Sequence, residues 1–347
     1  MSSRIHRIEL ANPVYFDRGV VENTLKAIVR SGYGSPDVLT LEDVPKPSPS
    51  DGEVMVRVHA SSVNMADVDY LLGRPKVARL ATGMRKPRNR ALGLDVAGEV
   101  EAVGGGVSRF LAGDEVIGDL TEHGFGAFAD YVCAPEAAFA PKPTTMTFEQ
   151  AAAVPQAGVM ALQGLRGAGG TTSGQRVLIN GAGGNVGPFA VQIAKAFGAV
   201  VTGVDGPHKL DMLRSIGADH VIDYTKEDFT RLGQRYDRIL DIAAFRPLSE
   251  SKRALRSEGV YVMIPGSMPG VFRGLIAGPL ISLVGRQKMG MLMWKPFHEP
   301  DVALLTDLLE TGKVVPVIDR VYELIEVATA LRYQQEGRPR GKVVITI

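Results

Sequence analysis

The most constraining feature of this chain is a glycine-rich loop that joins an apolar strand to an apolar helix, in RVLINGAGGNVGPFAVQIAKAFG at residues 176–198. Its glycines have the spacing G-x-x-G-x-x-G. Glycines let the backbone approach a pyrophosphate, and the free N–H groups and dipole of a helix start favour its negative charge. In this setting the pattern predicts a dinucleotide site, and the alternative is a tight structural turn. The residues expected at the dinucleotide are Asn180, Gly181, Gly183, Gly184, Asn185, Val186 and Gly187.

Strands and helices alternate after this loop, which predicts a parallel sheet covered on both faces. The expected strands are 199–205, 218–224, 236–243 and 259–265, with helices at 208–217 and 248–259. Before about residue 140, short strands broken by glycine indicate a β-rich domain. Between the two regions, TFEQAAAVPQAGVMALQGLRG predicts one helix with Thr147 as N-cap and Gln150 three residues later. The late strands 314–325 and 341–347 are expected to rejoin the first domain.

Length and composition narrow the class of protein. A chain of 347 residues predicts two domains. Lys and Arg number 39 against 38 Asp and Glu, so the basic footprint of a nucleic-acid binder is missing. A single cysteine, Cys133, excludes an internal disulfide and a zinc site built of several thiolates. The apolar run 274–285 is too short to span a bilayer, which takes about 20 residues, and we expect a cytoplasmic protein.

The residues after the second strand bear on the choice between NAD and NADP. Asp205 ends that strand, where an acidic residue accepts the ribose hydroxyls of NAD and repels a 2′-phosphate. His208 and Lys209 follow, and basic groups there can pair with that phosphate. The alternative for Lys209 is a solvated residue at a helix start. The sequence leaves the preference open.

These features in this order resemble the medium-chain dehydrogenase/reductase superfamily, and within it the zinc-free quinone oxidoreductase, or zeta-crystallin-like, branch. Matching stretches run from LKAIVRSGYGSPDVLTLEDVPKP through SSVNMADVDYLLGRP, ALGLDVAGEVEAVG and SIGADHVIDY to RGKVVITI. The resemblance implies a GroES-like β-rich catalytic domain and a Rossmann domain with a doubly wound parallel sheet. It also implies an active site between them, NADP(H) as cofactor with NAD(H) left open by Asp205, and a homodimer. The expected divisions are an extension at 1–24, the GroES-like domain at 25–149 and 296–347, and the Rossmann domain at 150–295.

The zinc ligands of related alcohol dehydrogenases have no equivalents here. By resemblance their positions fall near Asn64, Leu94 and Gln156. Leucine cannot bind zinc, and an amide is a poor ligand. We therefore expect no catalytic metal, and a reaction that needs no Lewis acid. Direct hydride transfer from NAD(P)H to a quinone or an α,β-unsaturated carbonyl meets that condition.

Candidate catalytic residues come from the segment SSVNMADVDY. Asn64 matches the branch's asparagine near the nicotinamide, and the alternative is a loop-capping residue. Asp67 also matches the branch, and the alternative is a residue that holds the loop. Tyr70 has the chemistry of a donor or proton relay, and the alternative is a pocket wall or core residue.

Further cofactor contacts follow from the resemblance alone. Tyr224 and Lys342 match positions near the nucleotide, and the alternatives are a strand-end aromatic and a surface lysine. The nicotinamide half is expected beside Ile242, Ala243, Pro265, Gly266 and Ser267. Where the branch has a glycine after LDIA, Ala244 and Phe245 follow instead, and these would narrow the nicotinamide pocket.

Two segments go beyond what the simplest members of the branch contain. Residues 1–24 form either a flexible arm or an upstream start, and the apolar segment 269–293 is a lid, a dimer contact or an in-plane anchor. Membrane contact is the least favoured of these. Two other functions stay open: a zinc-free alcohol or aldehyde dehydrogenase, and a non-catalytic cofactor-binding protein.

Overall fold

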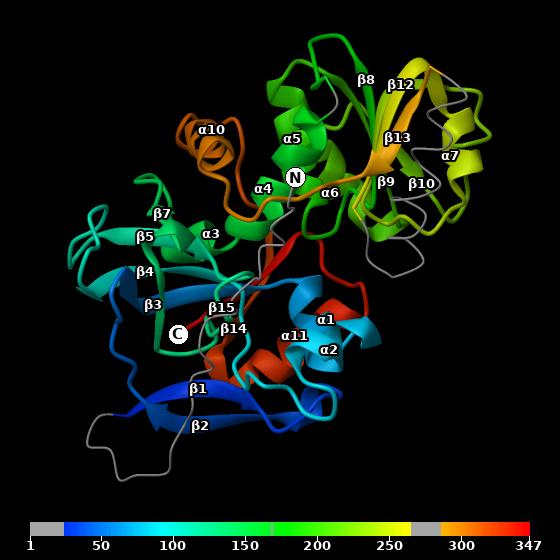
Figure 1. Ribbon diagram of the computed structural model, residues 1–347. Helices are drawn as coiled ribbons and strands as arrows, with labels where there is room; N and C mark the ends of the chain where they lie inside the picture. The colour runs from blue at the N-terminus through cyan, green and yellow to red at the C-terminus, as the bar shows by residue number, and fades with distance from the viewer. Residues whose placement is uncertain (1–23, 168, 265–285) are drawn as a thin grey trace, which may run out of the picture.

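The computed structural model describes residues 24–167, 169–264 and 286–347 (Figure 1). Two large sheets, of six and seven strands, occupy separate lobes, and a two-stranded sheet lies beside the seven-stranded one. The expectations for residues 1–23, for Pro265, Gly266 and Ser267, and for most of the apolar segment fall outside the described residues.

The six-stranded sheet has the order β10-β9-β8-β11-β12-β13, and every neighbouring pair is parallel. Its strands are β8 (Arg176–Asn180), β9 (Val200–Asp205), β10 (His220–Asp223), β11 (Tyr236–Asp241), β12 (Leu255–Met263) and β13 (Lys288–Met291). Its helices are α4 (Pro155–Arg166), α5 (Gly187–Ala196), α6 (Leu210–Ser215) and α7 (Leu248–Arg253).

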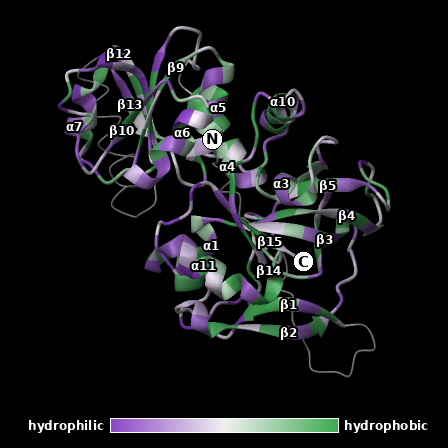
Figure 2. Ribbon diagram, turned by 180° about the vertical axis from the view of Figure 1, so that it is seen from behind, coloured by the Kyte–Doolittle hydropathy of each residue, from purple (hydrophilic) through white to green (hydrophobic). Residues whose placement is uncertain are grey.

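Both faces of this sheet are buried, as the near-continuous apolar strands predict. Val177 and Ile179 of β8 belong to the apolar core that contains α4 and α5. Leu178 between them faces the opposite core, which contains Leu248 of α7. The predicted parallel sheet with helices on both faces is confirmed. Figure 2 shows the hydrophobic segments of both lobes in green.

The seven-stranded sheet belongs to the other lobe and has the order β14-β15-β3-β4-β5-β7, with β6 paired to β3. Its strands are β3 (Glu53–Val63), β4 (Asp95–Val103), β5 (Glu115–Asp119), β6 (Tyr131–Pro135), β7 (Phe139–Pro141), β14 (Ile318–Glu323) and β15 (Lys342–Thr346). Strand β15 pairs antiparallel with β3, with Val343 opposite Val63. The prediction that the last strands rejoin the first domain is therefore confirmed.

Smaller elements complete this lobe and the connections. The two-stranded sheet pairs β1 (Thr24–Arg30) with β2 (Leu39–Pro45). The helices are α1 (Met65–Leu72), α2 (Arg79–Thr82), α3 (Phe148–Ala152), α10 (Glu299–Glu310) and α11 (Val327–Gln335). No helix in the described part of the chain is long and apolar enough to cross a membrane.

Two helix predictions need correction. The single helix expected from Thr147 onward is two helices, α3 and α4, because Pro155 lacks an N–H and is accommodated only in a first turn, where it starts α4. The expected cap at Thr147 is confirmed, since its Oγ accepts from the backbone N–H of Gln150 at 3.3 Å. The helix expected over 248–259 ends at Arg253. Strand β12 begins at Leu255, because the residues from there on pair with β11.

Candidate active site

The glycine loop leads directly from β8 into α5. Gly181 has φ +80°, a conformation that side chains rarely adopt, and its N–H donates to Val204 O at 3.0 Å. A Cβ at Gly187 would lie 2.1 Å from Ala182 O, so only glycine fits there. The loop thus brings backbone N–H groups and a helix start to one point, which is the arrangement that binds a pyrophosphate. Val186 directly precedes α5.

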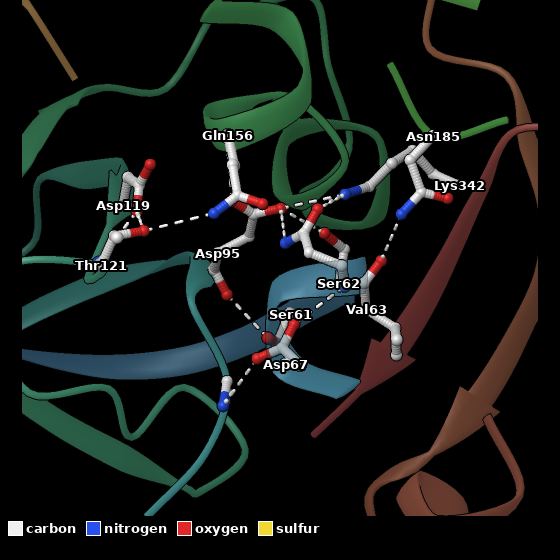
Figure 3. Close-up of polar contacts among 12 residues, drawn as sticks. Ser61, Ser62, Val63, Asp67, Asp95, Asp119, Thr121, Gln156, Asn185 and Lys342 are labelled. Carbon is white, nitrogen blue, oxygen red and sulfur yellow. Dashed lines mark hydrogen bonds and ion pairs between the residues drawn. The ribbon is translucent and has the colours of Figure 1, made fainter. Parts of the chain in front are cut away.

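Two asparagines of this loop fasten it to its surroundings. Asn180 Nδ2 donates to Asp241 Oδ1 at 2.8 Å, and its carbonyl accepts from the N–H groups of Ile242 and Ala243. Asn185 Nδ2 donates to Val63 O at 3.0 Å, in the other lobe. Figure 3 shows this bond between Asn185 and Val63. Since Val63 directly precedes Asn64 in the chain, the predicted dinucleotide loop and the predicted catalytic asparagine lie side by side.

Asp205 and Lys209 form a buried ion pair beside the loop. The Lys209 Nζ lies 3.6 Å from Asp205 Oδ1, and both side chains are about nine-tenths buried. Asp205 Oδ2 also accepts from the N–H of Gly183 at 2.7 Å. Lys209 is therefore not the solvated residue of the alternative interpretation, because its ammonium compensates the charge of Asp205. Nearby, His208 is exposed, and the N–H of Tyr224, whose side chain is also exposed, donates to Asp205 O at 3.3 Å.

A buried polar network surrounds Asn64, which lies between β3 and α1. Lys342 Nζ donates to Asn64 Oδ1 at 2.6 Å and to Asp95 Oδ2 at 3.0 Å. Asn64 Nδ2 donates to the same Asp95 oxygen at 2.8 Å. Ser62 Oγ and the N–H of Gln156 donate to Asp95 as well, at 2.6 and 2.9 Å. Lys342 is fully buried, so its interpretation as a surface lysine is wrong.

Asp67 supports the loop that carries Asn64. Its carboxylate accepts from the backbone N–H groups of Asn64 at 2.8 Å and Gly93 at 3.2 Å. Burial, and secondarily the charge of Asp95, raise the pKa of Asp67 to about 8. Burial therefore favours the protonated form of this carboxyl group, against the two backbone hydrogen bonds that favour the carboxylate.

Tyr70 lies one turn further along α1 and is half-buried. Its ring centroid is 4.4 Å from that of Phe125. The pKa of its phenol is raised, first by burial and then by the charges of Asp67 and Asp119. The Tyr70 phenol therefore interacts electrostatically with both carboxyl groups.

Asp119 is a buried residue that the sequence interpretation missed. It ends β5 directly opposite Asp95, with an exposed fraction of 1 %, and its Oδ1 accepts from the N–H of Thr121 at 2.9 Å. Within the described ranges its Oδ2 has no hydrogen-bond partner. Burial and the charge of Asp95 raise the pKa of Asp119 to about 7. The available signal was an acidic residue at the end of the apolar strand EVIGD.

Comparison with known proteins agrees with this arrangement. Residues 50–144 match the alcohol dehydrogenase GroES-like domain, and residues 216–345 match the family described as zinc-binding dehydrogenase. The chain is 34% identical over 336 residues to the 2-methylene-furan-3-one reductase of Solanum lycopersicum, covering 94% of this chain and 80% of that protein. It is 32% identical to the NADPH-dependent alkenal/one oxidoreductase, chloroplastic, of Arabidopsis thaliana, with the same coverage. The quinone oxidoreductase structure from Coxiella burnetii superposes with a TM-score of 0.82 at 29% identity, covering 94% of this chain and all of that one.

The chain belongs to the medium-chain dehydrogenase/reductase superfamily. It is an NAD(P)H-dependent oxidoreductase of the quinone oxidoreductase branch, as the resemblance implied.

The matched family's description raises the question of whether this oxidoreductase could hold zinc. Of the three positions where the superfamily carries ligands, Leu94 is an alkyl side chain, fully buried. Asn64 Oδ1 already accepts from the Lys342 ammonium, which would repel a cation, and Gln156 Nε2 donates to Thr121 Oγ at 3.2 Å. The residues at these positions do not fit zinc. In the described part of the chain no group of three His, Cys, Asp or Glu side chains could hold a metal ion.

Ala244 and Phe245 lie in the loop that follows β11 in this oxidoreductase. Ala244 is buried, and its N–H donates to Asp241 Oδ1 at 2.8 Å. The Phe245 side chain is 87% exposed. The expectation that Phe245 narrows the nicotinamide pocket therefore finds no support in the placement of its ring.

Proposed function

We propose that this enzyme uses NADPH to reduce an α,β-unsaturated ketone or aldehyde, or a quinone, without a metal ion. The observation that carries the proposal is the Lys342–Asn64–Asp95 network beside the glycine loop. By resemblance, Asn64 stands at one of the superfamily's metal-ligand positions, and here its amide is engaged in hydrogen bonds. Such a site suits an acceptor that is already electrophilic. The names of two relatives, an alkenal/one oxidoreductase and a methylene-furanone reductase, belong to this class of acceptor.

The preference for NADPH rests on Lys209. Because its ammonium already compensates Asp205 at 3.6 Å, the carboxylate presents little net charge to a 2′-phosphate. His208 and Tyr224 flank the same strand end and are exposed, so they can contact the adenosine side of the cofactor. The residues that would hold the pyrophosphate are the backbone N–H groups between Gly181 and Gly187.

When bound, NADPH supplies a hydride for the electrophilic carbon of the acceptor. The Asn64 amide is held on both sides, since Lys342 donates to its oxygen and Asp95 accepts from its nitrogen. Asn64 Nδ2 carries a second hydrogen, and in this proposal it donates to the acceptor oxygen. One preorganised donor of this kind contributes about 3–4 kcal/mol to transition-state stabilisation.

Asp119 is our candidate for the proton donor. Three carboxyl groups, Asp67, Asp95 and Asp119, share this region with the ammonium of Lys342, which is bound to Asp95. A buried polar atom without a partner costs about 1–3 kcal/mol, and a substrate oxygen would relieve that cost at Asp119 Oδ2. Reduction of an enone at its β-carbon would shift the C=C electron pair toward the carbonyl carbon and the carbonyl pair onto oxygen, and Asp119 would donate its proton to that oxygen, giving an enol that rearranges to the saturated ketone. Asp119 is left as a carboxylate and takes a proton back from solvent.

The test follows oxidation of NADPH, and separately of NADH, with an acyclic enone, an alkenal, an ortho-quinone and the saturated ketone that matches the enone. The proposal expects turnover with the unsaturated acceptors and no measurable turnover with the saturated ketone. Faster reaction of the saturated ketone would support the alcohol dehydrogenase alternative. Cofactor binding with no oxidation by any acceptor would support the binding-only alternative.

A further inference from the structure

An unusual concentration of positive charge follows α1. Residues 70–94 contain seven basic residues and no acidic one, which is a local net charge of +7 in a chain whose overall net charge is +1. Five of the seven are exposed and form no ion pair within the described ranges: Arg74, Lys76, Arg85, Lys86 and Arg88.

Three apolar side chains stand among these basic residues. Val77, Leu80 and Met84 are 54%, 65% and 67% exposed. A short 3-10 helix, Lys76–Ala78, runs directly into α2, so Val77 and Leu80 lie three residues apart on adjoining helical turns, and Met84 follows Gly83, where α2 has ended. Apolar side chains on helical turns normally face a protein core, but these three are exposed to solvent.

The segment is attached firmly by its other side. Tyr33 and Thr82 are linked through their hydroxyl groups at 2.8 Å. The Arg79 guanidinium donates to the carbonyls of Gly73 and Leu72, both at 2.9 Å, and lies over the Tyr33 ring. These contacts fix the segment against the β-rich lobe and leave Val77, Leu80 and Met84 on its exposed side.

We infer that the segment from Arg74 to Arg88, which we call the basic-apolar patch, docks on an anionic lipid surface. A bilayer interface rewards both properties at once, because its headgroups attract basic side chains and its acyl boundary accepts apolar ones. An acidic protein or a nucleic acid would satisfy the charges, but the charges alone would not explain three exposed apolar side chains. The basic-apolar patch contains none of the residues 269–293 considered in the sequence.

Docking would bring the proposed active site near the bilayer. Gly73 ends α1, the helix that carries Asp67 and Tyr70 and follows Asn64, and the patch starts at the next residue. Figure 1 draws α1 and α2 together at one side of the β-rich lobe. An acceptor dissolved in lipid would then reach the enzyme from the membrane, a consequence that rests on the proposed function, whereas the docking itself does not.

Vesicle flotation of the full chain tests the docking without any substrate. The protein should float with vesicles of phosphatidylcholine and phosphatidylserine at low salt, and stay at the bottom with phosphatidylcholine alone or at 0.5 M salt. The double variant Arg85→Gln/Lys86→Gln should lose about 25-fold in partitioning, at about fivefold per basic residue. Leu80→Gln should lose about tenfold because less apolar surface enters the interface.

Matched controls come from elsewhere on the surface. Leu111 is 73% exposed and Lys313 is exposed, both outside the basic-apolar patch, so Leu111→Gln and Lys313→Gln should float like the unmodified chain. Three results would overturn the inference: no flotation with anionic vesicles, equal losses in the controls, or a loss with Arg85→Gln/Lys86→Gln but not with Leu80→Gln. The last result would show that the attraction to the vesicles is electrostatic alone and that the exposed apolar side chains do not enter the bilayer. The absence of NADPH oxidation in the assay of the proposed function would not alter the flotation result. The two proposals can therefore fail separately.

Discussion

Lys342 Nζ donates to Asn64 Oδ1 at 2.6 Å, although 278 residues separate the two in the chain. The ammonium also contacts Asp95 at 3.0 Å, and both members of this ion pair are fully buried. Strand β15 thus supplies the positive charge of this site, and Asn64 directly follows strand β3. This contact ties folding of the β-rich lobe to the geometry of the proposed site.

Replacing Lys342 with methionine should destabilise the protein. The substitution keeps most of the side-chain volume but leaves the Asp95 carboxylate buried without its ammonium, which costs about 3–5 kcal/mol. Chemical denaturation should show this decrease in the free energy of unfolding. The double variant Lys342→Met/Asp95→Asn should recover part of it, because no uncompensated charge remains. A single variant within 1 kcal/mol of the parent would contradict the inferred role of the pair.

Replacing Asp119 with asparagine should slow the proposed reduction. Removal of a general acid lowers rates by about 10²–10⁴-fold, and we expect a fall in kcat with a smaller change in KM. In the parent enzyme the protonated carboxyl is the active form, so kcat should decrease as pH rises through about 7. That pH dependence should be absent from Asp119→Asn. An unchanged pH profile in the variant would show that Asp119 only shapes the site.

The stability of the folded protein should also depend on Asp119. Its folded pKa of about 7 lies above the unfolded value of about 3.9, so the folded state binds the proton more tightly. The free energy of unfolding therefore decreases as pH rises from about 4 to 7, by up to about 4 kcal/mol for this group. Asp67, with a folded pKa of about 8, acts in the same direction. Thermal unfolding between pH 4 and 8 should be less pH-dependent in Asp119→Asn than in the parent.

Lys209→Ala should shift the cofactor preference toward NADH. Without the ammonium, the buried Asp205 carboxylate would repel a 2′-phosphate, and we expect the ratio of kcat/KM for NADPH over NADH to fall by about tenfold or more, or about 1.4 kcal/mol. His208→Ala is the control for an exposed basic position, with a smaller expected effect. An equal loss with both cofactors would mean that Lys209 mainly supports the fold.

Gly187→Ala should damage the dinucleotide loop. The new Cβ would meet Ala182 O at 2.1 Å, so the loop and the start of α5 must shift. Cofactor binding, measured by NADPH fluorescence, should weaken by at least tenfold. Gly32→Ala is a suitable control, because a Cβ there has no neighbour within 4 Å, and its stability change should stay within about 0.5 kcal/mol. Normal binding in Gly187→Ala would argue that α5 does not receive the phosphates.

The sequence predicted those parts of the protein that depend on neighbouring residues. The passage from β8 through Gly181 and Gly187 into α5 follows from apolar runs and glycine spacing, and Thr147 caps α3 because its partner is three residues away. The end of α7 at Arg253 and the split at Pro155 were exceptions, and the second of them was local. The local rule for proline was available there, but the alanine-rich sequence on both sides favoured one continuous helix.

The tertiary structure decided what each polar residue near the site can do. The sequence singled out Asn64, Asp67 and Lys342 by resemblance, yet only the pairing of β15 with β3 brings the lysine to the asparagine. Asp119 was not singled out at all, because its unusual proton affinity comes from burial and from Asp95 on the adjacent strand. Residue type and spacing determine local backbone structure. The pKa of a buried carboxyl group depends on desolvation and on neighbours distant in the chain. Its shift from the ordinary value therefore arises only once the sheet has formed.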